Sequence, residues 1–164
     1  MRFIRSRMRR AGAGAGAVLA LAVPMAAQAD AATVRLHAST ATGESLQGPS
    51  FFGSSVFLAA TNANASNQKW VKTDVGGGYA TYRSLAGTNK PMCLAASAFN
   101  SRPFAAICNP SSFAQQWTRG FVNDGRIENR STFTALTRQS NGVLEVRFLG
   151  GGQVGQNWHE HIIG

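Results

Sequence analysis

The chain has 164 residues and a formal net charge of +9, with sixteen basic and seven acidic residues, two cysteines and three tryptophans. Its basic character suggests a nucleic-acid partner, but five of the basic residues lie within Arg2–Arg10 and the other eleven are scattered. Because no cluster forms a stripe that could follow phosphates, we expect no nucleic-acid partner.

The first 29 residues are predicted to be a cleaved signal peptide. The arginines are followed by an uncharged run at 11–23 and then by Ala27-Gln28-Ala29, which places small residues at positions −3 and −1 of a cleavage site. An apolar run of 13 residues is shorter than the roughly 20 that span a bilayer, so no membrane anchor is expected after cleavage. The leader's arginine and alanine content is typical of a bacterial protein. We predict that residues 30–164 are secreted and extracellular, with a net charge of +4.

The mature chain begins with short apolar runs that are separated by glycine, proline and serine. Val34–Leu36 and Val56–Leu58 are predicted strands, and Gly48-Pro49-Ser50 and the polar stretch Thr61–Asn67 are predicted turns. Short runs bounded by turn residues are typical of strands and not of helices.

The same plan continues to the end of the chain. Tyr79–Arg83 and Phe104–Cys108 are predicted strands, and Asn141-Gly142 is a hairpin-type turn. Val143–Leu149 alternates apolar and polar residues, as a half-buried strand does. No long stretch has helical periodicity, so the fold class is predicted to be all-β.

All three tryptophans close a Gln-x-Trp step. The steps are Gln68-Lys69-Trp70, Gln115-Gln116-Trp117 and Gln156-Asn157-Trp158, and successive tryptophans are 47 and 41 positions apart. A recurring segment of about forty residues indicates a repeat architecture. We predict three repeats, at about 32–72, 73–120 and 121–164, within one domain that covers 30–164.

The two cysteines, Cys93 and Cys108, allow one intramolecular disulfide, and export from the cell permits it. Their separation does not match a C-x-x-C redox motif, and no histidine lies between them, so a structural bridge is favoured over a redox or metal site. Closing a loop of this length stabilises a fold by about 3 kcal/mol.

An enzyme is the least supported class. The histidines are His37, His159 and His161, and the last two would share one face of a strand as a possible metal pair. No third ligand is evident and no nucleophile-elbow motif occurs. We therefore expect no catalytic residue, no metal site and no cofactor.

The repeat pattern resembles the ricin-type (ricin B-like) β-trefoil lectin family. The matching pieces are the three Gln-x-Trp steps, Cys93-Leu94 with Cys108-Asn109 before the second step, and Gly125-Arg126-Ile127 after it. The resemblance covers essentially the whole mature chain. It implies three pseudo-symmetric subdomains and a barrel capped by hairpins. Domains of this family are often attached to a catalytic domain, but the trefoil would use all of residues 30–164, so we expect a small secreted protein that stands alone.

The resemblance also implies roles for individual residues. The Gln-x-Trp side chains are structural in the family: Gln68, Trp70, Gln115, Trp117, Gln156 and Trp158. Its sugar pocket uses an aspartate after the Cys-Leu pair, an aromatic residue and a polar residue near the second cysteine. The aspartate positions here hold Gln47, Ala95 and Thr137, none of which is acidic.

A degraded or non-standard sugar pocket is therefore expected. The candidate carbohydrate-binding residues are Gln47, Phe57 and Asn62 in the first repeat and Asn109 in the second. The predicted partner is a glycan or cell-wall polysaccharide. The alternative is a non-catalytic protein-binding subunit of a secreted toxin or enzyme complex, because a fold does not fix a function.

Overall fold

The computed structural model describes residues 31–39, 43–49, 51–86, 89–119, 125–150 and 155–163. The predicted signal peptide and its cleavage site lie outside these ranges. Within them, no helix is both long enough and apolar enough to cross a membrane.

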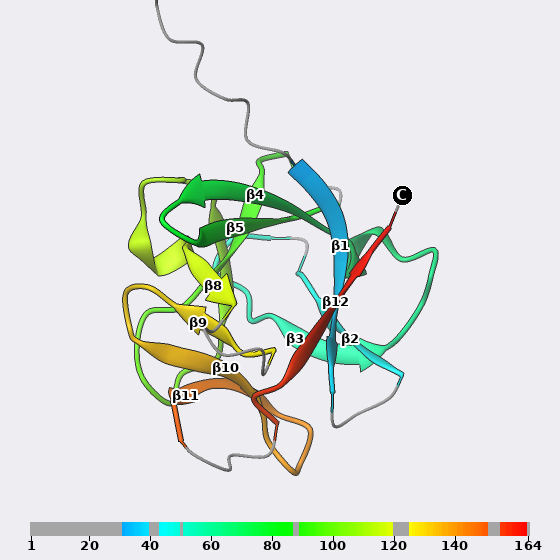
Figure 1. The fold of residues 1–164 in the computed structure, drawn as a ribbon. Coiled ribbons are helices and arrows are strands. Elements are labelled where there is room, and N and C mark those ends of the chain that lie inside the picture. The colour runs from blue at the N-terminus through cyan, green and yellow to red at the C-terminus, as the bar shows by residue number, and fades with distance from the viewer. Residues whose placement is uncertain are drawn as a thin grey trace, which may run out of the picture.

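The described residues form twelve strands and two short 3-10 helices, and the strands fall into three units of four (Figure 1). The first unit contains β1 (Ala31–Ala38), β2 (Glu44–Gln47), β3 (Phe57–Ala60), η1 (Ser66–Gln68) and β4 (Trp70–Gly76). The second contains β5 (Tyr79–Ser84), β6 (Met92–Ala95), β7 (Phe104–Ile107), η2 (Phe113–Gln115) and β8 (Trp117–Arg119). The third contains β9 (Ile127–Asn129), β10 (Thr134–Arg138), β11 (Leu144–Phe148) and β12 (Trp158–Ile162).

The outer strands of each unit close into a ring. Antiparallel pairing runs from β12 to β1, β4, β5, β8 and β9 in turn. A bridge between Arg126 and Asn157 connects β9 back to the start of β12. The first and last strands therefore lie side by side, as Figure 1 shows for β1 and β12. Among the described strands, closing the ring leaves no unpaired sheet edge in it.

The inner strands of each unit pair as hairpins, β2 with β3, β6 with β7, and β10 with β11. Backbone hydrogen bonds join the hairpins to one another. Val56 N donates to Pro103 O at 2.8 Å, and Val146 N donates to Ser101 O at 2.9 Å. The segment before β7 therefore lies between the first and third units.

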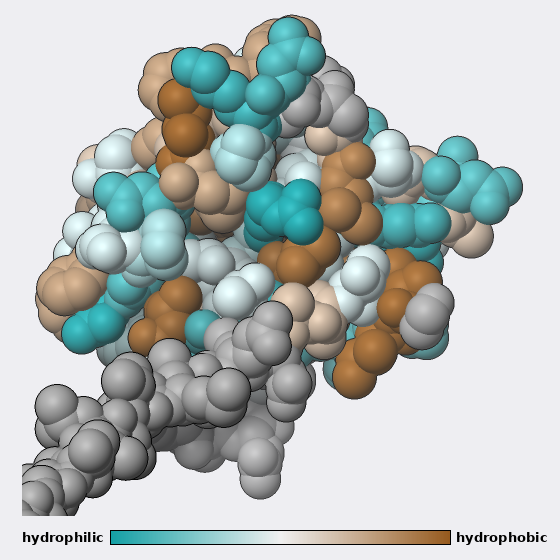
Figure 2. Space-filling view, turned by 90° about the horizontal axis from the view of Figure 1, so that it is seen from above, coloured by the Kyte–Doolittle hydropathy of each residue, from teal (hydrophilic) through white to brown (hydrophobic). Residues whose placement is uncertain are grey.

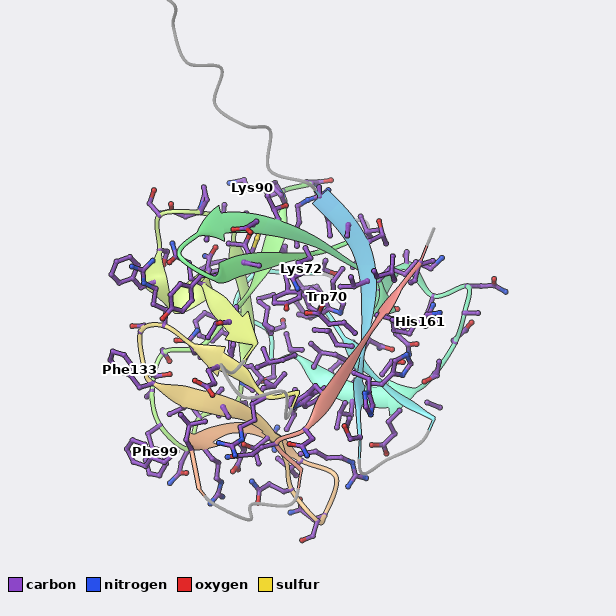
Figure 3. All side chains as sticks on the ribbon, viewed as in Figure 1. Trp70, Lys72, Lys90, Phe99, Phe133 and His161 are labelled. Atoms are coloured by element: carbon purple, nitrogen blue, oxygen red, sulfur yellow. A yellow bond between two sulfur atoms is a disulfide. The ribbon has the colours of Figure 1, made fainter. Side chains whose placement is uncertain are left out.

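The core is shared by all three units. Trp70, Trp117 and Trp158 are fully buried and pack with leucines that the hairpins supply, among them Leu46, Leu94 and Leu136. Figure 3 shows Trp70 in the interior of the ring. One unit cannot cover its own apolar face, and the three units together bury it.

None of the phenylalanines that the structure describes belongs to this core. Seven of the eight described phenylalanines are more than two-fifths exposed, and Phe104 is half-buried. Large exposed apolar side chains on a soluble domain are often interaction sites when they gather in patches.

Two details differ from or add to the sequence-based prediction. The predicted boundary after residue 72 lies inside β4, because this strand continues to Gly76 and turns there into β5. The 3-10 helices η1 and η2, which precede the first two tryptophans, were not predicted. As expected, the structure joins Cys93 and Cys108 in a disulfide, which links β6 to the residue that follows β7.

Candidate functional site

The glutamine of each Gln-x-Trp step holds the turn that precedes it. Gln68 Nε2 donates to Ala60 O at 2.8 Å, and Gln68 Oε1 accepts the backbone N–H of Asn62 at 2.8 Å. Gln115 makes the same two bonds, to Ile107 O at 2.9 Å and from Asn109 N at 2.8 Å.

The third glutamine repeats half of this pattern. Gln156 Nε2 donates to Phe148 O at 2.9 Å. Gln156 Oε1 is buried and has no hydrogen-bond partner among the described residues. In each unit the amide therefore satisfies a carbonyl eight residues earlier, at the end of the hairpin.

The tryptophans are held in the same way. Their indole N–H groups donate to leucine carbonyls, Trp70 to Leu46 at 3.1 Å, Trp117 to Leu94 at 2.9 Å and Trp158 to Leu136 at 2.9 Å. A buried indole needs such a partner. With no exposed ring face, these side chains contribute packing and are not available to a ligand.

The polar groups of the first-unit candidate site are engaged within the protein. Gln47 Oε1 accepts a hydrogen bond from Gln68 Nε2 at 3.1 Å, and Asn62 Oδ1 accepts one from Asn64 N at 2.9 Å. The structure thus brings Gln47 and Asn62 together through Gln68, but each already uses an acceptor internally. Gln47 is a weak substitute for the aspartate of the family's pocket, because its amide oxygen is uncharged and forms weaker hydrogen bonds with sugar hydroxyls than a carboxylate does.

Asn109 belongs to the second unit and is separate from the first-unit residues. It follows β7, and its Oδ1 accepts the backbone N–H of Ser111 at 3.0 Å, as Asn62 does with Asn64 in the first unit. The two asparagines are equivalent turn residues and do not form one site.

Phe57 faces a different neighbourhood. It pairs with Gln47 in the ladder between β2 and β3, and its side chain is 44% exposed. Phe57 lines a cavity of about 190 Å³ that neither Gln47 nor Asn62 lines. We call this the three-unit cavity, since the first unit contributes Ser55–Leu58, the second Arg102 and the third Gly142–Leu144.

A second cavity collects every histidine of the chain. It measures about 390 Å³ and is lined by His37, Ala38, Ser39, Gly43 and His159–His161. His37 on β1 pairs with His159 on β12, and the rings of His37 and His161 lie 6.5 Å apart. Figure 3 shows where His161 lies on β12. Among the described residues, no group of three or more His, Cys, Asp or Glu is placed to hold a metal ion.

Burial lowers the pKa of His37 from its ordinary value of 6.5. A hydrogen bond with Glu44 O raises this pKa, and electrostatic repulsion from Arg35, His161 and His159 lowers it, so that the net shift is downward. His37 Nδ1 lies 3.2 Å from that carbonyl oxygen. Because protonation is harder in the folded state, the unfolded chain binds the proton first as the pH falls.

The stability that His37 contributes is therefore complete above pH 6.5 and is lost as the pH falls through the lowered folded pKa. We expect the free energy of unfolding to fall less between pH 7.5 and pH 5.5 in His37→Asn than in the wild type. Urea midpoints at these two pH values measure this difference. Equal decreases in both proteins would contradict the assignment.

Comparison with known proteins identifies the fold. No protein-family model and no curated sequence matches the chain. Solved structures do match. The designed three-fold symmetric protein ThreeFoil aligns with a TM-score of 0.65 and 19% identity, over 78% of this chain and 96% of its own.

Two natural lectins align similarly. The β-trefoil lectin of Vibrio vulnificus hemolysin/cytolysin, with N-acetyl-D-lactosamine bound, has a TM-score of 0.62 and 17% identity, over 80% of this chain and 95% of its own. The fold is a β-trefoil. The Polyporus squamosus lectin, bound to a human-type influenza-binding epitope, has a TM-score of 0.64 and 18% identity over 79% of this trefoil and 48% of its own chain.

The histidine cavity and the three-unit cavity lie in different places. The histidine cavity lies along the β1–β12 seam of the ring, and the three-unit cavity lies among the hairpins. The sequence predicted Phe57 as a binding residue but not Arg102, because no local motif relates a residue before β7 to one at the start of β3.

Proposed function

We propose that this protein is a secreted, carbohydrate-binding β-trefoil that acts by binding and not by catalysis. The observation that carries the proposal is its fold, which it shares with two lectins whose structures contain a bound sugar. Its leader, with an arginine-rich start and an Ala27-Gln28-Ala29 site, supports export. A partner outside the cell, such as a surface glycan or cell-wall polysaccharide, fits both features.

The sugar pocket that the sequence resemblance implies is degraded in this protein. The aspartate position of the first unit is Gln47, whose oxygen accepts a bond from Gln68. The corresponding residues of the other units are Ala95, which has no polar side-chain atom, and Thr137, whose hydroxyl donates to Ala135 O at 2.9 Å. Sugar binding must therefore use other side chains.

Co-sedimentation with insoluble cell-wall polysaccharides tests this function. Purified protein comprising residues 30–164 is mixed with each polysaccharide, and the fraction that sediments is measured with and without competing free sugar. Retention by one polysaccharide class that the free sugar reverses supports the proposal. A folded protein that stays in the supernatant with every polysaccharide counts against it.

A second candidate is a non-catalytic subunit that binds another protein. The observation in its favour is a group of exposed rings that we call the aromatic strip, Phe99, Phe113, Phe133 and Phe148. Figure 2 shows hydrophobic side chains at several separate places on the face seen from above. Aromatic residues are enriched in protein interfaces.

Within the aromatic strip, Phe99 and Phe148 contact each other, and Phe133 and Phe113 are related to them through neighbouring residues. The rings of Phe99 and Phe148 lie 4.0 Å apart, and Phe133 precedes Thr134, which pairs with Phe148. The guanidinium of Arg130 lies over the ring of Phe113 at 4.0 Å, in the same turn as Phe133. Figure 3 shows Phe133 and Phe99 on one flank of the molecule.

The strip gives a prediction that separates the two candidates. If a secreted protein binds there, Phe133→Ala, which removes a ring that is 72% exposed, should reduce its capture by more than about fivefold, as loss of an interface anchor does. Phe52→Ala removes a ring of similar exposure outside the strip and is the matched control. Equal capture by both variants would exclude the strip as the interface.

A further inference from the structure

We infer that the three-unit cavity binds a sugar ring that carries a carboxylate, with Arg102 as the anion-binding group and Phe57 as the ring-contacting group. This inference rests on the proposed function, since it names the site and the ligand class of the same carbohydrate-binding activity. The carboxylated sugar could be a uronic acid or a sialic acid, and both share the chemistry that the cavity recognises.

The backbone on both sides of Arg102 is fixed. Ser101 O accepts the N–H of Val146 from the third unit at 2.9 Å, and Pro103 O accepts the N–H of Val56 from the first unit at 2.8 Å. Asn100 N donates to Val146 O at 2.9 Å. Arg102 is therefore held between two other units, although it lies in a loop. A site positioned in this way loses little backbone entropy on binding.

The cavity combines apolar and polar surfaces. Val56 and Leu144 are almost fully buried members of the core and close its inner side. Phe57 is 44% exposed, and Ser55 is exposed and carries a hydroxyl. An apolar surface with a few convergent polar groups is the usual composition of a small-molecule site.

The size of the cavity suits one sugar ring. Its volume of about 190 Å³ is below the roughly 300–1,000 Å³ of pockets for drug-sized molecules. One face of a sugar ring presents C–H groups, which can contact the ring of Phe57, while hydroxyls at the ring edge can bond Ser55. The cavity therefore fits a single residue at the end or side of a glycan.

Charge selects among such sugars. Arg102 is the cation that lines the cavity, and no acidic residue is among the described residues that line it. A guanidinium binds a carboxylate through two parallel hydrogen bonds, and these charge-assisted bonds are stronger than bonds between neutral groups. A neutral sugar of the same shape lacks this interaction.

Titration calorimetry with matched sugars tests the inference. The probes are glucuronic acid and N-acetylneuraminic acid as carboxylated sugars and glucose and N-acetylglucosamine as neutral ones. We expect the wild type to bind a carboxylated sugar at least about tenfold more tightly than the neutral ones, as a charged hydrogen bond provides. Arg102→Gln should remove most of this preference. Arg102→Lys should keep part of it, since lysine retains the positive charge but cannot form the two parallel hydrogen bonds of a guanidinium.

Two controls make the result specific. Arg83→Gln removes the same charge from β5, outside the cavity, and should leave the preference unchanged. Because arginine stays charged, binding should be constant between pH 5.5 and pH 7.5. Binding of the carboxylate to protonated histidines would instead strengthen as the pH falls.

Each outcome decides one point. Binding of both sugar classes with equal affinity, or a preference that survives Arg102→Gln, would overturn the inference and leave the carbohydrate-binding function standing. A preference for carboxylated sugars that rises steeply at low pH would indicate binding at the histidines and would also overturn the inference. Failure of folded wild-type protein to bind any of these sugars or any polysaccharide would contradict the proposed function itself.

Discussion

Trp117→Ala is expected to lower the free energy of unfolding by about 3–5 kcal/mol, the range measured for removal of a large buried aromatic side chain. Trp117 is fully buried, and its indole N–H is bonded to Leu94 O at 2.9 Å. Its loss leaves a cavity where the second unit meets the shared core and leaves that carbonyl without the indole donor. For a domain of this size we expect the midpoint of thermal unfolding to fall by roughly 10–20 °C.

Two variants separate packing from hydrogen bonding at this position. Trp117→Phe keeps much of the packed volume but loses the indole N–H, and its effect should lie between that of Trp117→Ala and the wild type. Phe52→Ala removes an aromatic side chain that is 67% exposed and should change stability by less than about 0.5 kcal/mol. If Trp117→Ala were no more destabilising than Phe52→Ala, the tryptophans would not be the structural centre of each unit.

Removing the disulfide is the second large expected effect. Replacing Cys93 and Cys108 together by alanine should lower the free energy of unfolding by about 3 kcal/mol, because the open loop has more freedom in the unfolded chain. Cys93 is almost fully buried, so the loss of packing adds to this effect. The first and third units hold the same hairpin without a described disulfide, so the double variant is expected to keep the fold.

Denaturation with and without a reducing agent measures this contribution. Reductant should destabilise the wild type by nearly as much as the double substitution does, and it should have no effect on the double variant. A wild type whose unfolding midpoint is the same in both conditions would show that the bridge is absent in solution. The double variant avoids the free thiol that Cys93→Ala alone would leave at Cys108.

The architecture could be predicted from sequence because its largest residues recur at a regular spacing. Each tryptophan marks the place where a unit enters the core, and its glutamine partner ends the hairpin that precedes it. Gln68, Gln115 and Gln156 each donate a hydrogen bond to the carbonyl of the residue eight positions earlier. The repeat can therefore be recognised in the sequence as well as in the structure.

The binding site could be predicted only in part. Phe57 was named from its place in the first repeat, and the structure places it in a cavity. Asn62 and Gln47 were named for their polar side chains, but sequence does not show that Asn62 caps a turn or that Gln47 bonds Gln68. Phe57, Arg102 and Leu144 meet only because three hairpins converge, and residues more than forty positions apart carry no local signal of such a meeting.

The most direct test of carbohydrate binding is a glycan and cell-wall polysaccharide array probed with protein comprising residues 30–164. The array should pair each carboxylated glycan with its neutral counterpart. We expect binding to one glycan class, with the carboxylated member preferred and free sugar competing. A silent array with folded protein would contradict a lectin-like function and would favour a protein partner at the aromatic strip.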